Sequence, residues 1–122
     1  MFPAIPAQMN ALDAYLLGEP ERGVAALKAV THADFRDPEL RFYLARQAAR
    51  LGATDAGNDL LRRSVEEGYW SPRTMMCDPW LESLRNTAAF RDTYELAKQR
   101  AAQSKTAFLE AGGERVLSEA HR

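Results

Sequence analysis

The stretch LGEPERGVAALK at residues 17–28 recurs 34 residues later as LGATDAGNDLLR at residues 51–62. Four positions are identical at this offset: Leu17/Leu51, Gly18/Gly52, Gly23/Gly57 and Leu27/Leu61. Pro38 and Pro72 are separated by the same interval. A fixed period of about 20 to 50 residues is typical of stacked helical repeats. The repetition therefore predicts an all-α fold, and it sets the frame in which the rest of the chain is interpreted.

The residues of the repeated stretch predict where one helix ends and the next begins. A glycine after the last apolar residue, as at Gly18 and Gly52, takes the left-handed cap conformation without steric penalty. Glu21 and Asp55 then fall in the first turn of the following helix, where a carboxylate faces the positive end of the helix dipole. Each copy thus reads as the junction between two helices.

Gly23 and Gly57 fall inside the second helix of each unit, ahead of the apolar Leu27 and Leu61. Glycine within a helix costs about 1 kcal/mol relative to alanine. Its presence at the same place in both copies indicates that another helix approaches closely there. The predicted unit is a pair of antiparallel helices that cross over a small residue.

This unit resembles the tetratricopeptide repeat, which has 34 residues, small residues where its helices cross and a proline near its end. The positions that carry the resemblance are Gly18, Gly23, Leu27, Gly52, Gly57 and Leu61, with Pro38 and Pro72. It covers about residues 4–72. Two positions depart from the family pattern, because Arg41 stands where a large aromatic residue is expected and Gly57 stands where alanine is usual.

The resemblance implies a single domain over 1–122, with a first repeat at 4–37, a second at 38–72, and a degenerate repeat with a capping helix at 73–122. The run from Gly68-Tyr69 through DPWLESLR at residues 78–85 to Phe90 is similar to the segment that closes repeat regions in many bacterial signalling proteins, including receptor-like kinases and winged-helix regulators. The chain therefore looks like the carboxyl-terminal end of a repeat array, either a fragment or a very short protein.

Apolar spacing and capping residues predict the individual helices. An extended lead over Pro3–Pro6 and a turn from His32 to Asp37 separate them, and Glu114–Arg122 is either a short helix or a frayed tail. The long last helix is expected to cover the open face of the second repeat with an apolar stripe that includes Phe90 and Phe108. The expected helices span 7–17, 21–31, 37–52, 54–67, 80–84 and 88–111.

Composition excludes several functional classes. The net charge of -1 is far from the basic balance of a nonspecific nucleic-acid binder. No apolar run approaches the roughly 20 residues that cross a bilayer, so no membrane association is expected. The first residues lack the features of a signal peptide, and the single Cys77 cannot form an internal disulfide. These features favour the cytoplasm.

The sequence offers little catalytic chemistry. His32 and His121 form no pair with metal-ligand spacing, so neither a metal nor a cofactor is expected. Cys77 lies in the apolar run Met75-Met76-Cys77, which reads as packing, and no histidine is near it in sequence. Aromatic residues beyond the repeats can form a core or a ligand-stacking site, and the core is the interpretation we prefer: Tyr69, Trp70, Trp80 and Phe90. The chain is expected not to be an enzyme.

One polar cluster stands out once the resemblance is taken into account. In the family, side chains of each first helix that do not pack against neighbours line a concave groove. Arg46 and Arg50 share a helix face, with Phe42 one turn earlier, and an apolar anchor beside two guanidinium groups can hold an acidic peptide or a free carboxylate. The alternative is a solvated face with ordinary surface arginines. In the second unit the groove positions are Glu39, Phe42, Arg46, Ala49 and Arg50.

Two functional classes follow. The first is a non-catalytic protein-interaction module that binds a peptide or a partner helix in the groove. The second is a regulatory or oligomerisation segment at the carboxyl terminus of a larger bacterial signalling protein, either a kinase or a transcription regulator.

The first helix also presents an apolar outer face with Ile5, Leu12, Tyr15 and Leu16, which predicts a homodimer through this helix.

Overall fold

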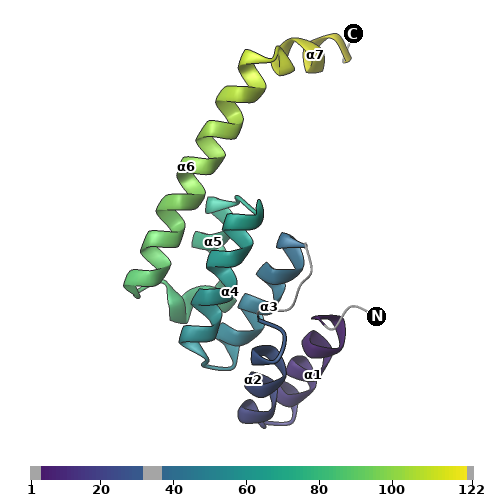
Figure 1. Ribbon diagram of the computed structural model, residues 1–122, viewed down its shortest axis with the longest axis vertical. Coiled ribbons are helices and arrows are strands. Elements are labelled where there is room, and N and C mark those ends of the chain that lie inside the picture. Colours follow the sequence, from purple (N-terminus) through teal and green to yellow (C-terminus); the bar gives the residue numbers. More distant parts are fainter. Residues whose placement is uncertain (1–3, 32–36, 121–122) are drawn as a thin grey trace.

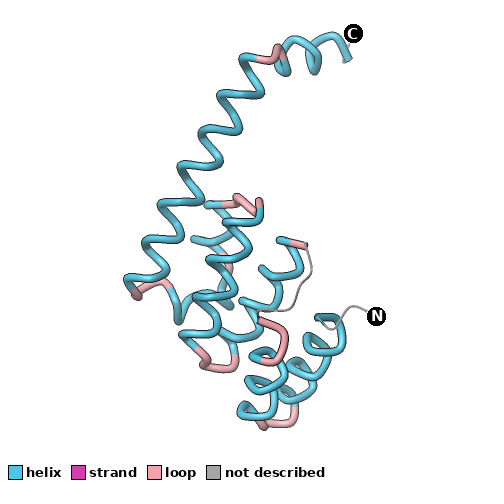
Figure 2. Tube along the Cα trace, in the orientation of Figure 1, coloured by secondary structure: helices cyan, strands magenta, loops and turns pink. Residues whose placement is uncertain are grey.

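The computed structural model of the chain describes residues 4–31 and 37–120. These parts consist of helices and turns without any strand (Figure 2), so the predicted all-α fold is confirmed. The helical elements are α1 (Ala4–Leu16), α2 (Pro20–Lys28), α3 (Pro38–Arg50), α4 (Thr54–Glu67), α5 (Pro72–Cys77), the 3-10 helix η1 (Pro79–Leu84), α6 (Ala88–Glu110) and α7 (Gly113–Ala120).

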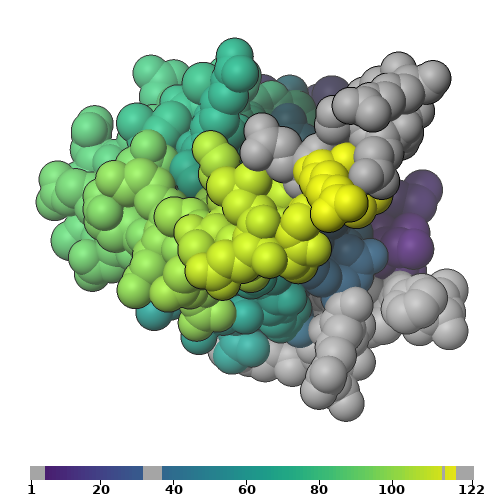
Figure 3. All heavy atoms as spheres, turned by 90° about the horizontal axis from the view of Figure 1, so that it is seen from above, coloured from purple at the N-terminus to yellow at the C-terminus, as the bar shows by residue number. Residues whose placement is uncertain are grey.

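The helices pack around α3. The most extensive contacts join α1 with α2 and α3 with α4, and α3 also touches α1, α2 and η1. The first half of α6 packs on α4 and α5, whereas its second half continues away from the other helices and leads into α7 (Figure 1). Residues 98–120, the second half of α6 with α7, are called the arm below. Seen from above, the arm stands in front of the packed helices (Figure 3).

Several of the predicted helix ends are where the capping residues placed them. Gly18 and Gly52 have φ angles of 70° and 82°, which is the left-handed conformation expected of a helix-ending glycine. The Asp37 carboxylate accepts a hydrogen bond from the Leu40 N–H at 2.9 Å and so caps α3. The Thr87 hydroxyl accepts from the Phe90 N–H at 3.2 Å and caps α6. Local sequence thus sets these boundaries.

The two internal glycines lie at close helix contacts, as their position in the repeat predicted. A Cβ atom on Gly23 would be 2.7 Å from Cδ1 of Leu51 and 3.1 Å from Cβ of Ala14. On Gly57 it would be 3.3 Å from Cδ1 of Leu84. The tighter contact at Gly23 brings α2 against α1 and against the end of α3. A larger residue there has to displace the Leu51 side chain and also presses on Ala14.

This contact predicts that Gly23→Val destabilises the fold even though valine is a better helix former than glycine. The added atoms overpack the junction with Ala14, which costs about 1–3 kcal/mol. Ala25→Val on the exposed part of the same helix is the matched control, because it changes only helix propensity. Urea unfolding followed by circular dichroism measures both. A stability for Gly23→Val equal to or above that of the unchanged protein would show that the contact is not tight.

The position where the family pattern expects an aromatic residue holds a buried arginine, which pairs with a carboxylate at the surface. Arg41 is only 3% exposed. Its Nε donates to the Glu67 carboxylate at 2.8 Å, and a terminal nitrogen donates to the Thr31 carbonyl at 2.9 Å. The guanidinium therefore joins the start of α3 to the end of α4 and to the turn after α2. A large side chain still fills the position, but it holds its neighbours by charge-assisted hydrogen bonds.

We expect Glu67→Ala to lower the free energy of unfolding by about 2 kcal/mol, because it removes the charge-assisted hydrogen bond between Arg41 on α3 and the end of α4. The double variant Arg41→Met/Glu67→Ala removes both charges and should recover part of this loss. Chemical denaturation of the two single variants and the double variant gives the coupling between them. Additive losses would mean that the two side chains do not interact.

Several expectations about local structure need correction. Ala4–Pro6 belong to α1 and not to an extended lead, and the second helix ends at Lys28 and not near Thr31. The sequence did not indicate the helix α5, which Pro72 starts. Cys77 at its end is exposed, so the packing interpretation of Met75-Met76-Cys77 holds only for Met75. Of the predicted turn from His32 to Asp37, residues 32–36 lie outside the described parts of the chain.

The last long helix covers less than its apolar stripe suggested. Phe90 and Ala97 are buried, but Phe108 and Leu109 are 46% and 44% exposed, because α6 has left the packed helices by that point. The stripe therefore covers α4 and α5 only over its first half. The terminal segment, for which a helix and a frayed tail were both considered, forms α7.

At the opposite end of the molecule, the apolar residues predicted on the outer face of α1 are exposed: Ile5, Leu12, Tyr15 and Leu16. A homodimer through this face stays a prediction.

Candidate functional site

Two of the five residues predicted to line the groove are buried. Phe42 is 2% exposed, and its ring stacks on Tyr69 with 4.6 Å between ring centroids. Ala49 is 4% exposed. The hypothesis that Phe42 serves as an apolar anchor for a partner is therefore wrong, since the side chain belongs to the core between α3 and the end of α4. The polar members of the set, Glu39, Arg46 and Arg50, remain at the surface of α3.

Arg46 already has a carboxylate partner within the chain. Its Nε lies 2.5 Å from Oδ2 of Asp78, whose side chain is only 7% exposed. The guanidinium carbon also lies 4.2 Å from the centroid of the Trp80 ring and 5.9 Å from that of Tyr43. Arg46 thus attaches η1 to α3, and the interpretation of both arginines as ordinary solvated charges does not apply to it.

Arg50 lies between two aromatic rings. Its guanidinium carbon is 3.6 Å from the ring centroid of Tyr15 on α1 and 4.1 Å from that of Trp80 on η1. No carboxylate of the described residues forms an ion pair with it. A cavity of about 450 Å³ opens beside it, lined by Tyr15, Ala49, Arg50, Pro79, Trp80, Glu82 and Ser83. The rings fix the plane of the guanidinium, while its five N–H donors stay available to a ligand.

Hydrogen bonds at both ends of η1 place Trp80 at this site. The Asp78 carboxylate accepts from the Trp80 N–H at 2.9 Å and so caps η1, which Pro79 starts. The Asp78 carbonyl accepts a hydrogen bond from the Arg85 guanidinium. The Ser83 hydroxyl donates to the Ala49 carbonyl at 3.2 Å and holds the other end of η1 on α3. The Asp-Pro pair therefore defines both the start of η1 and the direction of its tryptophan.

Two tyrosines near the arginines have raised pKa values. The Tyr43 hydroxyl donates to the Glu39 carboxylate at 2.7 Å, and this hydrogen bond raises the pKa of Tyr43 because it stabilises the neutral phenol. Burial is the main reason that the pKa of Tyr69 is also raised. Both phenols are neutral at neutral pH, and Glu39 is engaged by a neighbour on its own helix. The charged residues that line the cavity are Arg50 and Glu82.

Those of the other candidate residues that the structure describes form no second polar centre. His32 and His121 lie outside the described residues. Within residues 4–31 and 37–120, no group of three histidine, cysteine or carboxylate side chains is placed to bind a metal ion. Phe90 lies in the core as expected, whereas Trp70 is 36% exposed and donates from its indole nitrogen to the Val65 carbonyl at 2.8 Å. In the same described parts, no helix is long and apolar enough to span a bilayer.

The sequence interpretation missed that Tyr15 and Trp80 belong to the site. Trp80 was recognised as part of an aromatic cluster, but the core was preferred, and Tyr15 was assigned to the outer face of the first helix. Three elements bring the two rings together with Arg50, namely α1, α3 and η1. Their distance in sequence gives no local signal. The one available hint was the Asp78-Pro79 cap, which places Trp80 at the second position of a helix next to α3.

Comparison with known proteins gave no relationship, because no protein-family model, curated protein or solved structure significantly matches this chain.

The two arginines are expected to differ in their effect on stability. Arg46→Glu places a carboxylate beside the buried Asp78, and we expect it to lower the free energy of unfolding by about 3 kcal/mol. Arg50→Glu removes only contacts with two partly exposed rings, which should cost about 1 kcal/mol. Thermal and urea unfolding of both variants tests this order. Equal losses would indicate that the Asp78 pair contributes little.

Proposed function

We propose that this protein is a non-catalytic interaction module of tetratricopeptide-like construction, and that it binds a peptide through a carboxylate at Arg50. The proposal extends the resemblance found in the sequence and replaces the broader groove by a smaller site. Arg46 is engaged by Asp78, and Phe42 and Ala49 are buried, so Arg50 is the cation of the predicted set that a partner can reach. Tyr15 and Trp80 flank it and offer apolar surface to the same partner.

The observation that carries the proposal is the position of the Arg50 guanidinium between two rings at 3.6 and 4.1 Å, without a carboxylate partner in the described parts of the chain. An arginine held in one plane loses little side-chain entropy when it binds, and its donors match a carboxylate in bidentate fashion. The adjacent cavity of about 450 Å³ has room for one side chain or a chain terminus. A peptide that carries an aspartate, a glutamate or a free carboxyl terminus fits this chemistry.

Fluorescence of Trp80 can test the proposal, because the chain has two tryptophans and Trp70→Phe leaves Trp80 as the sole emitter. We expect a saturable change in emission when peptides rich in aspartate and glutamate, acetylated at the amino terminus and amidated at the carboxyl terminus, are added, and none with the same blocked peptides carrying asparagine and glutamine. Arg50→Gln should weaken the binding at least about tenfold, which corresponds to the loss of one charge-assisted hydrogen bond.

Arg62→Gln is the matched control. Arg62 is an exposed arginine on α4 that is paired with Glu66, so this substitution removes the same charge away from the site. Its affinity should equal that of the unchanged protein. Equal affinities for the acidic and the amide peptides, or an unchanged affinity in Arg50→Gln, would refute the proposed carboxylate site.

A further inference from the structure

The cavity beside Arg50 carries a second, opposite charge. Among the described residues that line it, Glu82 is the only acid and Arg50 the only base. The two side chains form no ion pair with each other, and neither forms one with any other residue in the parts of the chain that the structure describes. A carboxylate and a guanidinium thus border one space of about 450 Å³ without neutralising each other.

The geometry of η1 explains why Glu82 lies at the same cavity as Trp80. A 3-10 helix has about three residues per turn, so side chains three positions apart form rows along it. One row is Leu81 and Leu84, which are buried and attach η1 to the core. The other two rows line the cavity: Pro79 with Glu82, and Trp80 with Ser83.

Ring contacts hold Arg50 away from Glu82. The guanidinium carbon lies 3.6 Å from the ring centroid of Tyr15 and 4.1 Å from that of Trp80. A movement toward Glu82 would give up these contacts, and the ion pair formed in exchange would involve an exposed carboxylate and contribute little. The two charges therefore satisfy a ligand that brings both opposite charges better than they satisfy each other.

We propose that the ligand of this cavity is a peptide segment that carries a base close to its acid. The inference rests on the proposed carboxylate site at Arg50 and adds a second contact to it. Arg50 binds the carboxylate of the peptide, and Glu82 binds the ammonium of a lysine or the guanidinium of an arginine. Tyr15 and Trp80 contact the apolar stems of both side chains.

The spacing of the two charges in the peptide follows from the geometry of an extended chain. Successive side chains of such a chain point to opposite sides, whereas side chains two positions apart lie on one side, about 6.6 Å from each other. An acid and a base separated by one residue can therefore enter the cavity together. An acid and a base that are direct neighbours cannot, because one of them points away.

The second charge also sets which peptides bind less well. A segment with two acids at this spacing brings its second carboxylate to Glu82, which repels it. A segment with two bases has no group for Arg50. The preferred segment has no net charge, so its binding does not follow from the overall charge of the protein.

Titration calorimetry with peptides blocked at both ends tests the proposal on the full chain. The probes are Gly-Glu-Ala-Lys-Gly, the same peptide with glutamine in place of lysine, and Gly-Ala-Glu-Lys-Gly with the charges adjacent. We expect the first to bind about threefold to fivefold more tightly than the other two, which is the contribution of a partly exposed ion pair. Glu82→Gln should abolish this difference, and Glu82→Lys should reverse it in favour of Gly-Glu-Ala-Glu-Gly.

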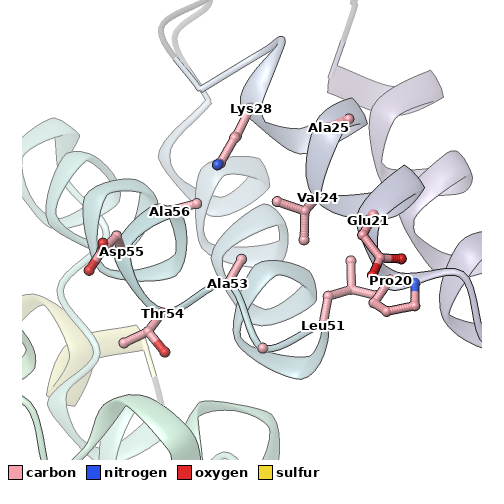
Figure 4. Close-up of a pocket in the computed structure, with 11 residues that line it drawn as sticks. Pro20, Glu21, Val24, Ala25, Lys28, Leu51, Ala53, Thr54, Asp55 and Ala56 are labelled. Atoms are coloured by element: carbon pink, nitrogen blue, oxygen red, sulfur yellow. The ribbon is translucent and has the colours of Figure 1, made fainter.

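Glu21→Gln is the matched control. Glu21 is also an exposed carboxylate in the first turn of a helix that begins with a proline, and it lies at a separate cavity of about 720 Å³ (Figure 4). No described residue lines both cavities. The substitution removes the same charge, and the preference for lysine should remain as in the unchanged protein.

The outcomes separate this inference from the proposed function. Glutamate peptides that bind through Arg50 with no gain from lysine, or a lysine preference that persists in Glu82→Gln, would overturn the inference and leave the carboxylate site in place. If no glutamate peptide binds, or if Arg50→Gln binds them all as well as the unchanged protein does, the proposed function and the inference are both wrong.

Discussion

The buried carboxylate of Asp78 is the group on which the candidate site depends. One oxygen accepts the Trp80 N–H and starts η1, and the other lies 2.5 Å from Nε of Arg46 on α3. A buried charge costs several kcal/mol unless another charge and hydrogen bonds compensate it, so Asp78 and Arg46 constrain each other. Their pairing fixes Trp80 against α3. Trp80 in turn holds Arg50, whose other ring contact, Tyr15, comes from α1.

The same constraint explains why the candidate binding site is small. Helix α3 carries two arginines one turn apart, and the chain itself neutralises the first of them. The second, Arg50, forms no ion pair with a described carboxylate and lies against rings from two other elements. A site made in this way suits one carboxylate with an apolar neighbour better than an extended acidic segment. The core residue Phe42 contributes by setting the position of α3 against Tyr69, and it has no direct contact with the cavity.

The two ends of the molecule differ from its middle. Around α3 the apolar side chains are enclosed, and the charged Arg41 is satisfied by Glu67 and the Thr31 carbonyl. At α1 and along the arm, large apolar side chains lie in the open. Helix α1 packs mainly on α2 and α3, and the second half of α6 extends away from the packed helices, so apolar side chains on both stay uncovered.

The sequence by itself indicated the close contacts at the repeated Gly23 and Gly57, and it determined the longer helices and most of their ends. The helices and their ends depend on residues near each other along the chain, such as the caps at Asp37 and Thr87 and the left-handed glycines, whose conformational preferences act locally.

The tertiary structure alone decided which polar side chains are engaged within the chain and which are not. Phe42 and Arg50 lie eight residues apart on one helix, and their spacing does not place one in the core and the other between two rings. That difference comes from Tyr69, Tyr15 and Trp80, which distant segments bring to α3, and from Asp78, which occupies Arg46. Side-chain burial and ion pairing are properties of the packed helices, and a helical period specifies only which residues share a face.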